Sequence, residues 1–89
     1  MEVLGQAVTS SADVLCDLRG LKCPLPVLKT RRRLKTLHDG DRLIVETTDP
    51  LAGIDIPHFC RQEGHELVES EKTADGHRFV IRKGMSATA

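Results

Sequence analysis

The sequence is almost without large aromatic side chains: it has no Trp and no Tyr, and its two Phe residues are Phe59 and Phe79. Stacking platforms for the bases of single-stranded nucleic acid need several such rings, so this kind of binding site is excluded. The chain also has no apolar run near 18 residues, and its start, Met1-Glu2-Val3, lacks the basic and apolar regions of a signal peptide. We therefore expect a cytoplasmic protein with no membrane-spanning segment.

The chain also has no excess of charge of either sign, because 13 Lys and Arg residues balance 13 Asp and Glu residues. Basic residues prevail in the first 40 positions and acidic residues in the remainder, which favours docking to a charged protein partner over direct binding of nucleic acid. A chain of 89 residues fits one domain with a small, aliphatic core. Any chemistry is therefore expected near the surface.

Cysteine is scarce, and its spacing excludes two common kinds of site. The three cysteines are Cys16, Cys23 and Cys60, an odd number with no C-x-x-C pair for thioredoxin-type exchange. His58 and Cys60 are one loose pair with no second pair at zinc-ligand spacing, so no metal site is expected. The hydrophobic pattern turns Cys16 and Cys60 toward the core, which leaves Cys23 as the candidate reactive thiol.

Periodicity predicts six elements. Alternation predicts a strand from Val14 to Leu18, and helical spacing predicts a helix from Pro24 to about Leu37, closed by His38-Asp39-Gly40. A second strand, 42–47, is followed by a helix that Asp49 caps and that ends at Gly64. Strands over 65–73 and 77–83 flank the hairpin signal Asp75-Gly76. Pro57 either kinks the second helix or marks a fresh start at Asp55.

The predicted order βαβαββ specifies a two-layer α/β sandwich, a four-stranded mixed sheet with both helices on one face. We expect this domain to span residues 14–84, between a flexible N-terminus over 1–13 and a flexible tail over 85–89. The first two strands run parallel, so the segments that follow them leave the same edge of the sheet. Cys23 and Asp49 should therefore be neighbours.

The segment Cys23-Pro24-Leu25-Pro26 suits a nucleophilic thiol at a helix start. With Pro24 as the first helical residue, Cys23 is the predicted N-cap, and the free amides of Cys23 and Leu25 can point at the sulfur. The helix dipole and these amides would lower the thiol pKa from about 8.5 toward about 7.5. Arg19 and Lys22 could add to this stabilisation of the thiolate.

The first helix also carries a basic run. Its members are Lys29, Arg31, Arg32, Arg33 and Lys35. Such a run is either a solvated helix face or a surface that steers an acidic partner toward the helix start.

On these residues the chain resembles the TusA/SirA family of small sulfur-transfer proteins over roughly residues 14–84. The resemblance rests on the following segments: Asp17-Leu18-Arg19-Gly20-Leu21-Lys22-Cys23-Pro24-Leu25-Pro26, Thr48-Asp49-Pro50, Asp55-Ile56-Pro57, Phe59-Cys60 and Ile81-Arg82-Lys83-Gly84.

The resemblance implies that Cys23 accepts sulfane sulfur as a persulfide from a cysteine desulfurase or rhodanese-like donor and passes it to an acceptor protein. Relays of this family feed tRNA thiolation, molybdenum-cofactor enzymes or sulfur oxidation. The resemblance also implies a partner-binding surface that includes Arg31, Lys35 and Asp49, and no cofactor or metal. The chain departs from many members at Leu25, where they have an acidic residue, so no proton-handling role can fall to that side chain.

Two other functions stay open from sequence. One is a non-catalytic protein- or RNA-interaction module that uses the basic side of the first helix. The other is a redox sensor that pairs Cys23 with Cys16 or Cys60, which requires one of those two sulfurs to be exposed and within bridging distance.

Overall fold

The computed structural model of the protein describes residues 13–84. In chain order the elements are β2 (Asp13–Leu18), α1 (Leu25–Leu34), β3 (Arg42–Thr47), α2 (Ala52–Glu63), β4 (Glu66–Lys72) and β5 (His77–Arg82). The predicted order βαβαββ is confirmed. The two segments predicted to be flexible lie outside the described residues, apart from Asp13, which begins β2.

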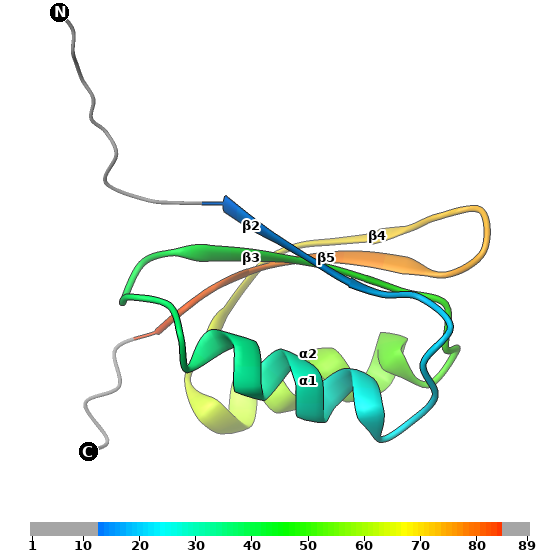
Figure 1. Ribbon diagram of the computed structural model, residues 1–89, viewed down its shortest axis with the longest axis horizontal. Helices are drawn as coiled ribbons and strands as arrows, with labels where there is room; N and C mark the ends of the chain where they lie inside the picture. The colour runs from blue at the N-terminus through cyan, green and yellow to red at the C-terminus, as the bar shows by residue number, and fades with distance from the viewer. Residues whose placement is uncertain (1–12, 85–89) are drawn as a thin grey trace, which may run out of the picture.

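The four strands form one mixed sheet in the order β2-β3-β5-β4. β2 runs parallel to β3, with Leu18 opposite Thr47, and the β3–β5 and β4–β5 pairs are antiparallel. Both helices lie on the same face of the sheet, beneath it in the view of Figure 1. The predicted two-layer sandwich is therefore confirmed, and its parallel pair brings the ends of β2 and β3 to one edge.

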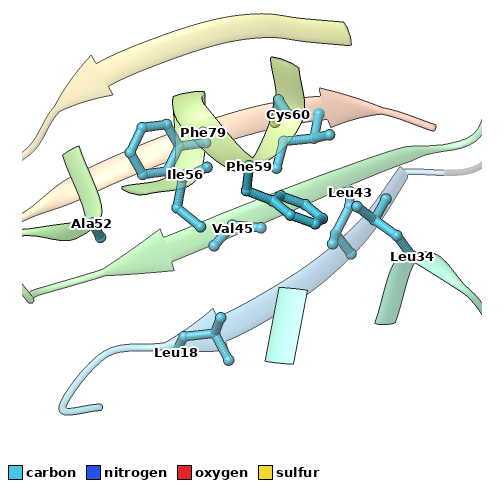
Figure 2. Close-up of a cluster of buried hydrophobic side chains, with 10 residues drawn as sticks. Leu18, Leu34, Leu43, Val45, Ala52, Ile56, Phe59, Cys60 and Phe79 are labelled. Atoms are coloured by element: carbon cyan, nitrogen blue, oxygen red, sulfur yellow. The ribbon is translucent and has the colours of Figure 1, made fainter. Parts of the chain in front are cut away.

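A single cluster of buried side chains fills the space between the sheet and the helices (Figure 2). Alternation along β3 puts Leu43 and Val45 into this core, both fully buried, because successive side chains of a strand point to opposite faces. Phe79 comes from β5 and Phe59 from α2, so both scarce aromatic rings are used for packing. Burying a side chain of this size contributes about 1.5–3 kcal/mol.

Helix α1 is shorter than the sequence predicted. It ends at Leu34, where the chain tightens into a turn in which Thr36 N–H donates to the Arg33 carbonyl (3.0 Å) and Leu37 N–H to the Leu34 carbonyl (3.1 Å). Bonds of this shorter span satisfy the last carbonyls of a helix. Gly40, with φ of 92°, belongs to the turn before β3 and does not cap the helix.

Helix α2 runs without interruption from Ala52 to Glu63 and contains Pro57. The alternative of a fresh start at Asp55 is therefore wrong. The helix ends where the sequence predicted, at Gly64, whose φ of 77° lets its N–H donate to the Cys60 carbonyl.

The hairpin between β4 and β5 turns at the predicted Asp75-Gly76. Thr73 N–H donates to the Gly76 carbonyl (2.9 Å), and Gly76 packs directly on the backbone of Thr47 and Thr48 with no room for a Cβ atom. The hairpin thus leans on the end of β3, at the sheet edge where the candidate site lies.

Candidate functional site

The loops that follow β2 and β3 are fastened together at this edge. Thr48 Oγ1 accepts a hydrogen bond from Gly20 N–H (2.9 Å). The Asp49 carboxylate accepts one from Cys23 N–H (2.6 Å) and one from Leu51 N–H (3.2 Å). Asp49 is only 9% exposed. The predicted neighbourhood of Cys23 and Asp49 is confirmed, and Asp49 fixes the backbone from which the Cys23 thiol projects.

The start of α1 differs from the prediction by one residue. The N-cap is Pro24, the first helical residue is Leu25, and Cys23 precedes the cap. Cys23 N–H is used by Asp49, and Leu25 N–H donates to the Lys22 carbonyl (2.8 Å). Both amides that the sequence assigned to the sulfur therefore have other acceptors, because the carboxylate from the neighbouring loop competes for the first of them.

The closest polar partner of the sulfur is a carboxylate. The Cys23 thiol donates a hydrogen bond to Asp55 Oδ2 (3.1 Å), from the first turn of α2. This bond, desolvation and the negative charges of Asp55 and Asp49 all raise the pKa of the Cys23 thiol. The prediction of a lowered pKa is wrong for the free protein: a hydrogen bond that the thiol donates favours its protonated form.

Asp55 was not among the site residues that the sequence indicated. The available signal was topological: α2 begins at the same sheet edge as α1, so polar residues in its first turn face the same loops. The spacing between Cys23 and Asp55 along the chain gives no local hint of the contact, which spans 32 positions.

Arg19 and Lys22, the two basic residues expected to stabilise the thiolate, are not among the charges that act on the Cys23 thiol. Arg19 forms a two-point ion pair with Asp17, with Nε–Oδ1 and Nη2–Oδ2 distances of 2.9 and 3.0 Å. That pair lowers the pKa of Asp17 to about 2 and leaves the Arg19 charge committed to it. Lys22 is exposed. The charges that set the pKa of Cys23 are thus acidic ones.

Exposed aliphatic side chains surround this edge, and we call them the apolar rim. Its members, with their exposed fractions, are Leu25 (42%), Leu28 (46%), Leu51 (51%) and Ile54 (69%). Leu25 and Leu28 also line a shallow hollow with Lys29 and Arg32. Leu51 and Ile54 come from the start of α2, close in sequence to Asp55. Large apolar groups left in solvent are typical of a protein docking surface.

The predicted partner-binding residues occupy three different environments. Arg31 is half-buried: its guanidinium carbon lies 5.5 Å from the centroid of the Phe59 ring, and Nη2 lies 3.5 Å from Glu63 Oε2. It therefore links α1 to α2. Lys35 is exposed at the end of α1, and Asp49 is enclosed in the loops.

The other two cysteines are not comparable to Cys23. Cys60 is 1% exposed, and burial raises its pKa to about 11. Cys16 is half-buried in β2, and burial is also the main cause that raises its pKa. All three are free thiols, and Cys23 is the exposed one. A redox sensor that pairs Cys23 with Cys60 requires an exposed Cys60 sulfur. The burial of Cys60 contradicts this requirement.

Among residues 13–84, no three His, Cys, Asp or Glu side chains gather closely enough to hold a metal ion. Within the same range, neither helix is long and apolar enough to cross a membrane.

Comparison with protein families identifies the family of this chain. The model of the family described as "Sulfurtransferase TusA" matches residues 15–83, which include the four strands almost entirely, both helices and the Cys23, Asp49 and Asp55 positions. The match thus covers most of the chain. The chain therefore belongs to the sulfurtransferase TusA family, and its role is that of a sulfur carrier in a relay between a donor and an acceptor.

Proposed function

We propose that Cys23 is the sulfur-carrying residue: it receives sulfane sulfur from a cysteine desulfurase or rhodanese-like donor and passes it to an acceptor protein. The observation that supports this most strongly is exposure. Cys23 is the one exposed thiol of the three, and hydrogen bonds to Asp49 and Thr48 fasten its loop at this edge of the sheet.

The proposed step is an exchange between two sulfurs with no net oxidation. The Cys23 thiol gives up its proton to solvent, and the thiolate attacks the terminal sulfur of the donor persulfide. A bond forms between Cys23 Sγ and that sulfur, the sulfur–sulfur bond of the donor breaks, and the donor thiolate leaves and takes up a proton. An acceptor thiolate then attacks the outer sulfur of the Cys23 persulfide. The bond between that sulfur and Cys23 Sγ breaks, and Cys23 leaves as a thiolate and takes up a proton.

The motif residues have supporting roles in this proposal. Pro24 and Pro26 shape the start of α1, and Pro26 is buried beneath it. Leu25, which stands in place of an acidic residue, offers an apolar contact to the partner. Arg19 and Lys22 flank the loop, and Lys35 with Arg31 and Asp49 belong to the proposed partner surface. The reaction uses no cofactor or metal, takes place in the cytoplasm, and can serve tRNA thiolation, molybdenum-cofactor enzymes or sulfur oxidation.

The test is intact mass after incubation with a cysteine desulfurase and cysteine. Wild type should gain about 32 mass units per sulfur, and Cys23→Ser should gain none. Cys16→Ser is the matched control, since it removes a half-buried thiol, and it should label as wild type does. Sulfur on the Cys23→Ser protein would defeat the assignment.

One observation favours a second candidate, a non-catalytic protein- or RNA-interaction module. On α1 and just after it, Lys29, Arg32, Arg33 and Lys35 are all exposed. Salt-dependent RNA binding that survives Cys23→Ser, together with no sulfur loading of wild type, would support this candidate over the carrier.

A further inference from the structure

The free carrier holds its own nucleophile in a poorly reactive form. The proton on Cys23 Sγ lies between the sulfur and Asp55 Oδ2, 3.1 Å apart. If the thiol ionises, two negative charges face each other at that distance without a proton between them. Thiolate is the reactive species in sulfur exchange, and this hydrogen bond favours the protonated thiol instead.

Within the described part of the chain, residues 13–84, no positive charge offsets the two acids beside the sulfur. The charges that act on the sulfur are those of Asp55 from α2 and Asp49 from the loop after β3, whereas Lys22 and Arg19 lie in the loop before α1. Arg19 is paired with Asp17, and the thiol pKa responds to the two acids. Among residues 13–84, no Lys or Arg nitrogen lies within 4.0 Å of the Asp55 carboxylate.

Asp55 therefore differs from Asp17 and Glu63, which have cationic partners among the described residues. Asp17 has Arg19, and Glu63 has Arg31, whereas Asp55 offers its carboxylate to the thiol alone. It is only partly exposed, and the adjacent Ile54 is the most exposed large apolar side chain of the described residues, at 69%. A partner that covers Ile54 would also enclose Asp55, which strengthens any ion pair made there because water is excluded.

We propose that Asp55 keeps Cys23 as a neutral thiol in the free carrier and is the binding site for a Lys or Arg side chain of the sulfur donor, whose docking releases the thiolate. This rests on the proposed function of Cys23. An ion pair between the donor cation and Asp55 replaces the thiol hydrogen bond. The thiol proton passes to solvent, and the thiolate then attacks the donor persulfide as described above.

The donor surface that fits is thus a cation flanked by apolar groups. The cation pairs with Asp55, and the apolar groups cover the apolar rim, Leu51 and Ile54 in particular. The arrangement confines reactivity to the docked complex: the idle carrier resists alkylation and oxidation, and the thiolate forms where a donor is present.

Three methanethiosulfonate reagents test this without any donor protein. They differ only in the group they carry, which is an ammonium, a methyl or a sulfonate group. In each case the thiolate attacks the reagent sulfur, and methanesulfinate leaves. On wild type the cationic reagent should react fastest and the anionic one slowest. Asp55→Asn should raise the rate of the neutral reagent about three- to tenfold at pH 7, because removal of a nearby negative charge shifts the thiolate pH profile downward.

The same substitution should reduce the ratio of cationic to anionic rates by about three- to tenfold. Asp39→Asn is the matched control: Asp39 is an exposed aspartate before β3, at the opposite end of that strand, and its replacement should change neither quantity. Asp55→Glu retains the charge and should keep the reagent preference. Circular dichroism verifies that all variants fold.

Unchanged neutral and charged rates in Asp55→Asn would overturn the proposal, as would equal changes in Asp39→Asn. The outcome is separable from that of the proposed function. A strong Asp55-dependent preference together with no sulfur loading would leave a gated thiol that is not a carrier. Normal loading with no Asp55 dependence would leave a carrier without this control.

Discussion

Two regions of this small domain each hold a cysteine with a raised pKa, and they achieve it in different ways. At the sheet edge, the pKa of Cys23 is raised chiefly by the hydrogen bond to Asp55, while the residue stays exposed. On the buried face of α2, the pKa of Cys60 is raised by burial. A charge can be neutralised by a partner that binds beside it, whereas burial ends only when the domain opens. The first arrangement suits a thiol that must react on demand, and the second suits a thiol that must never react.

The largest effect expected from the contrast between the exposed edge and the core is on protein stability. It is measured with two isoleucines of α2, one buried and one exposed. Ile56 is fully buried and Ile54 is 69% exposed, two positions away. Ile56→Ala should lower the free energy of unfolding by about 2–5 kcal/mol, because it leaves a cavity in the core. Ile54→Ala should change it by no more than about 0.5 kcal/mol. Urea denaturation measures both.

Equal losses in the two variants would mean that Ile54 packs in the core, and the apolar rim would then lose its most exposed member. If Ile54→Ala is stable but loads sulfur from a desulfurase more slowly, the assignment of that side chain to the docking surface is sharpened.

The same substitution at the two cysteines gives the next effect. Cys60→Ser places a hydroxyl group in an apolar, 1% exposed site and should cost about 1–3 kcal/mol of unfolding free energy. Cys23→Ser lies at an exposed position and should cost less than about 0.5 kcal/mol. Thermal or urea unfolding would contradict the comparison if Cys23→Ser proved the less stable of the two.

The smallest difference in stability between a variant and its control is expected for the hydrogen bonds by which Asp49 fastens the Cys23 loop. Asp49→Asn removes the charge that accepts hydrogen bonds from Cys23 N–H and Leu51 N–H but keeps one oxygen acceptor. Because bonds to a charged acceptor are the stronger kind, we expect a loss of about 1 kcal/mol. The control is again Asp39→Asn, at the other end of β3. A neutral result at Asp49 would show that the loop keeps its place without the charge.

Much of the architecture could be predicted because it depends on local patterns. The alternation of Val14, Cys16 and Leu18 predicted β2 and its inward face, and parallel pairing of the first two strands predicted that Cys23 and Asp49 are neighbours. These conclusions follow from periodicity and from the handedness of the crossover.

The electrostatics of the site could not be predicted in the same way. The sequence predicted that the amides of Cys23 and Leu25 serve the sulfur, but the Asp49 carboxylate takes one and the Lys22 carbonyl the other. The bond from Cys23 to Asp55 depends on how α2 is positioned against the loop, which is a tertiary property. The same cause reversed the sign of the predicted pKa shift.

If Cys23 is the residue that carries the sulfur, the added sulfur can be located on a single peptide of the wild-type protein. After incubation with a desulfurase and cysteine, the persulfides are capped with iodoacetamide, the chain is digested, and each cysteine peptide is weighed. We expect about 32 extra mass units on the peptide that contains Cys23, and none on those with Cys16 or Cys60. Extra sulfur on either of the other two, with Cys23 unmodified, would contradict it.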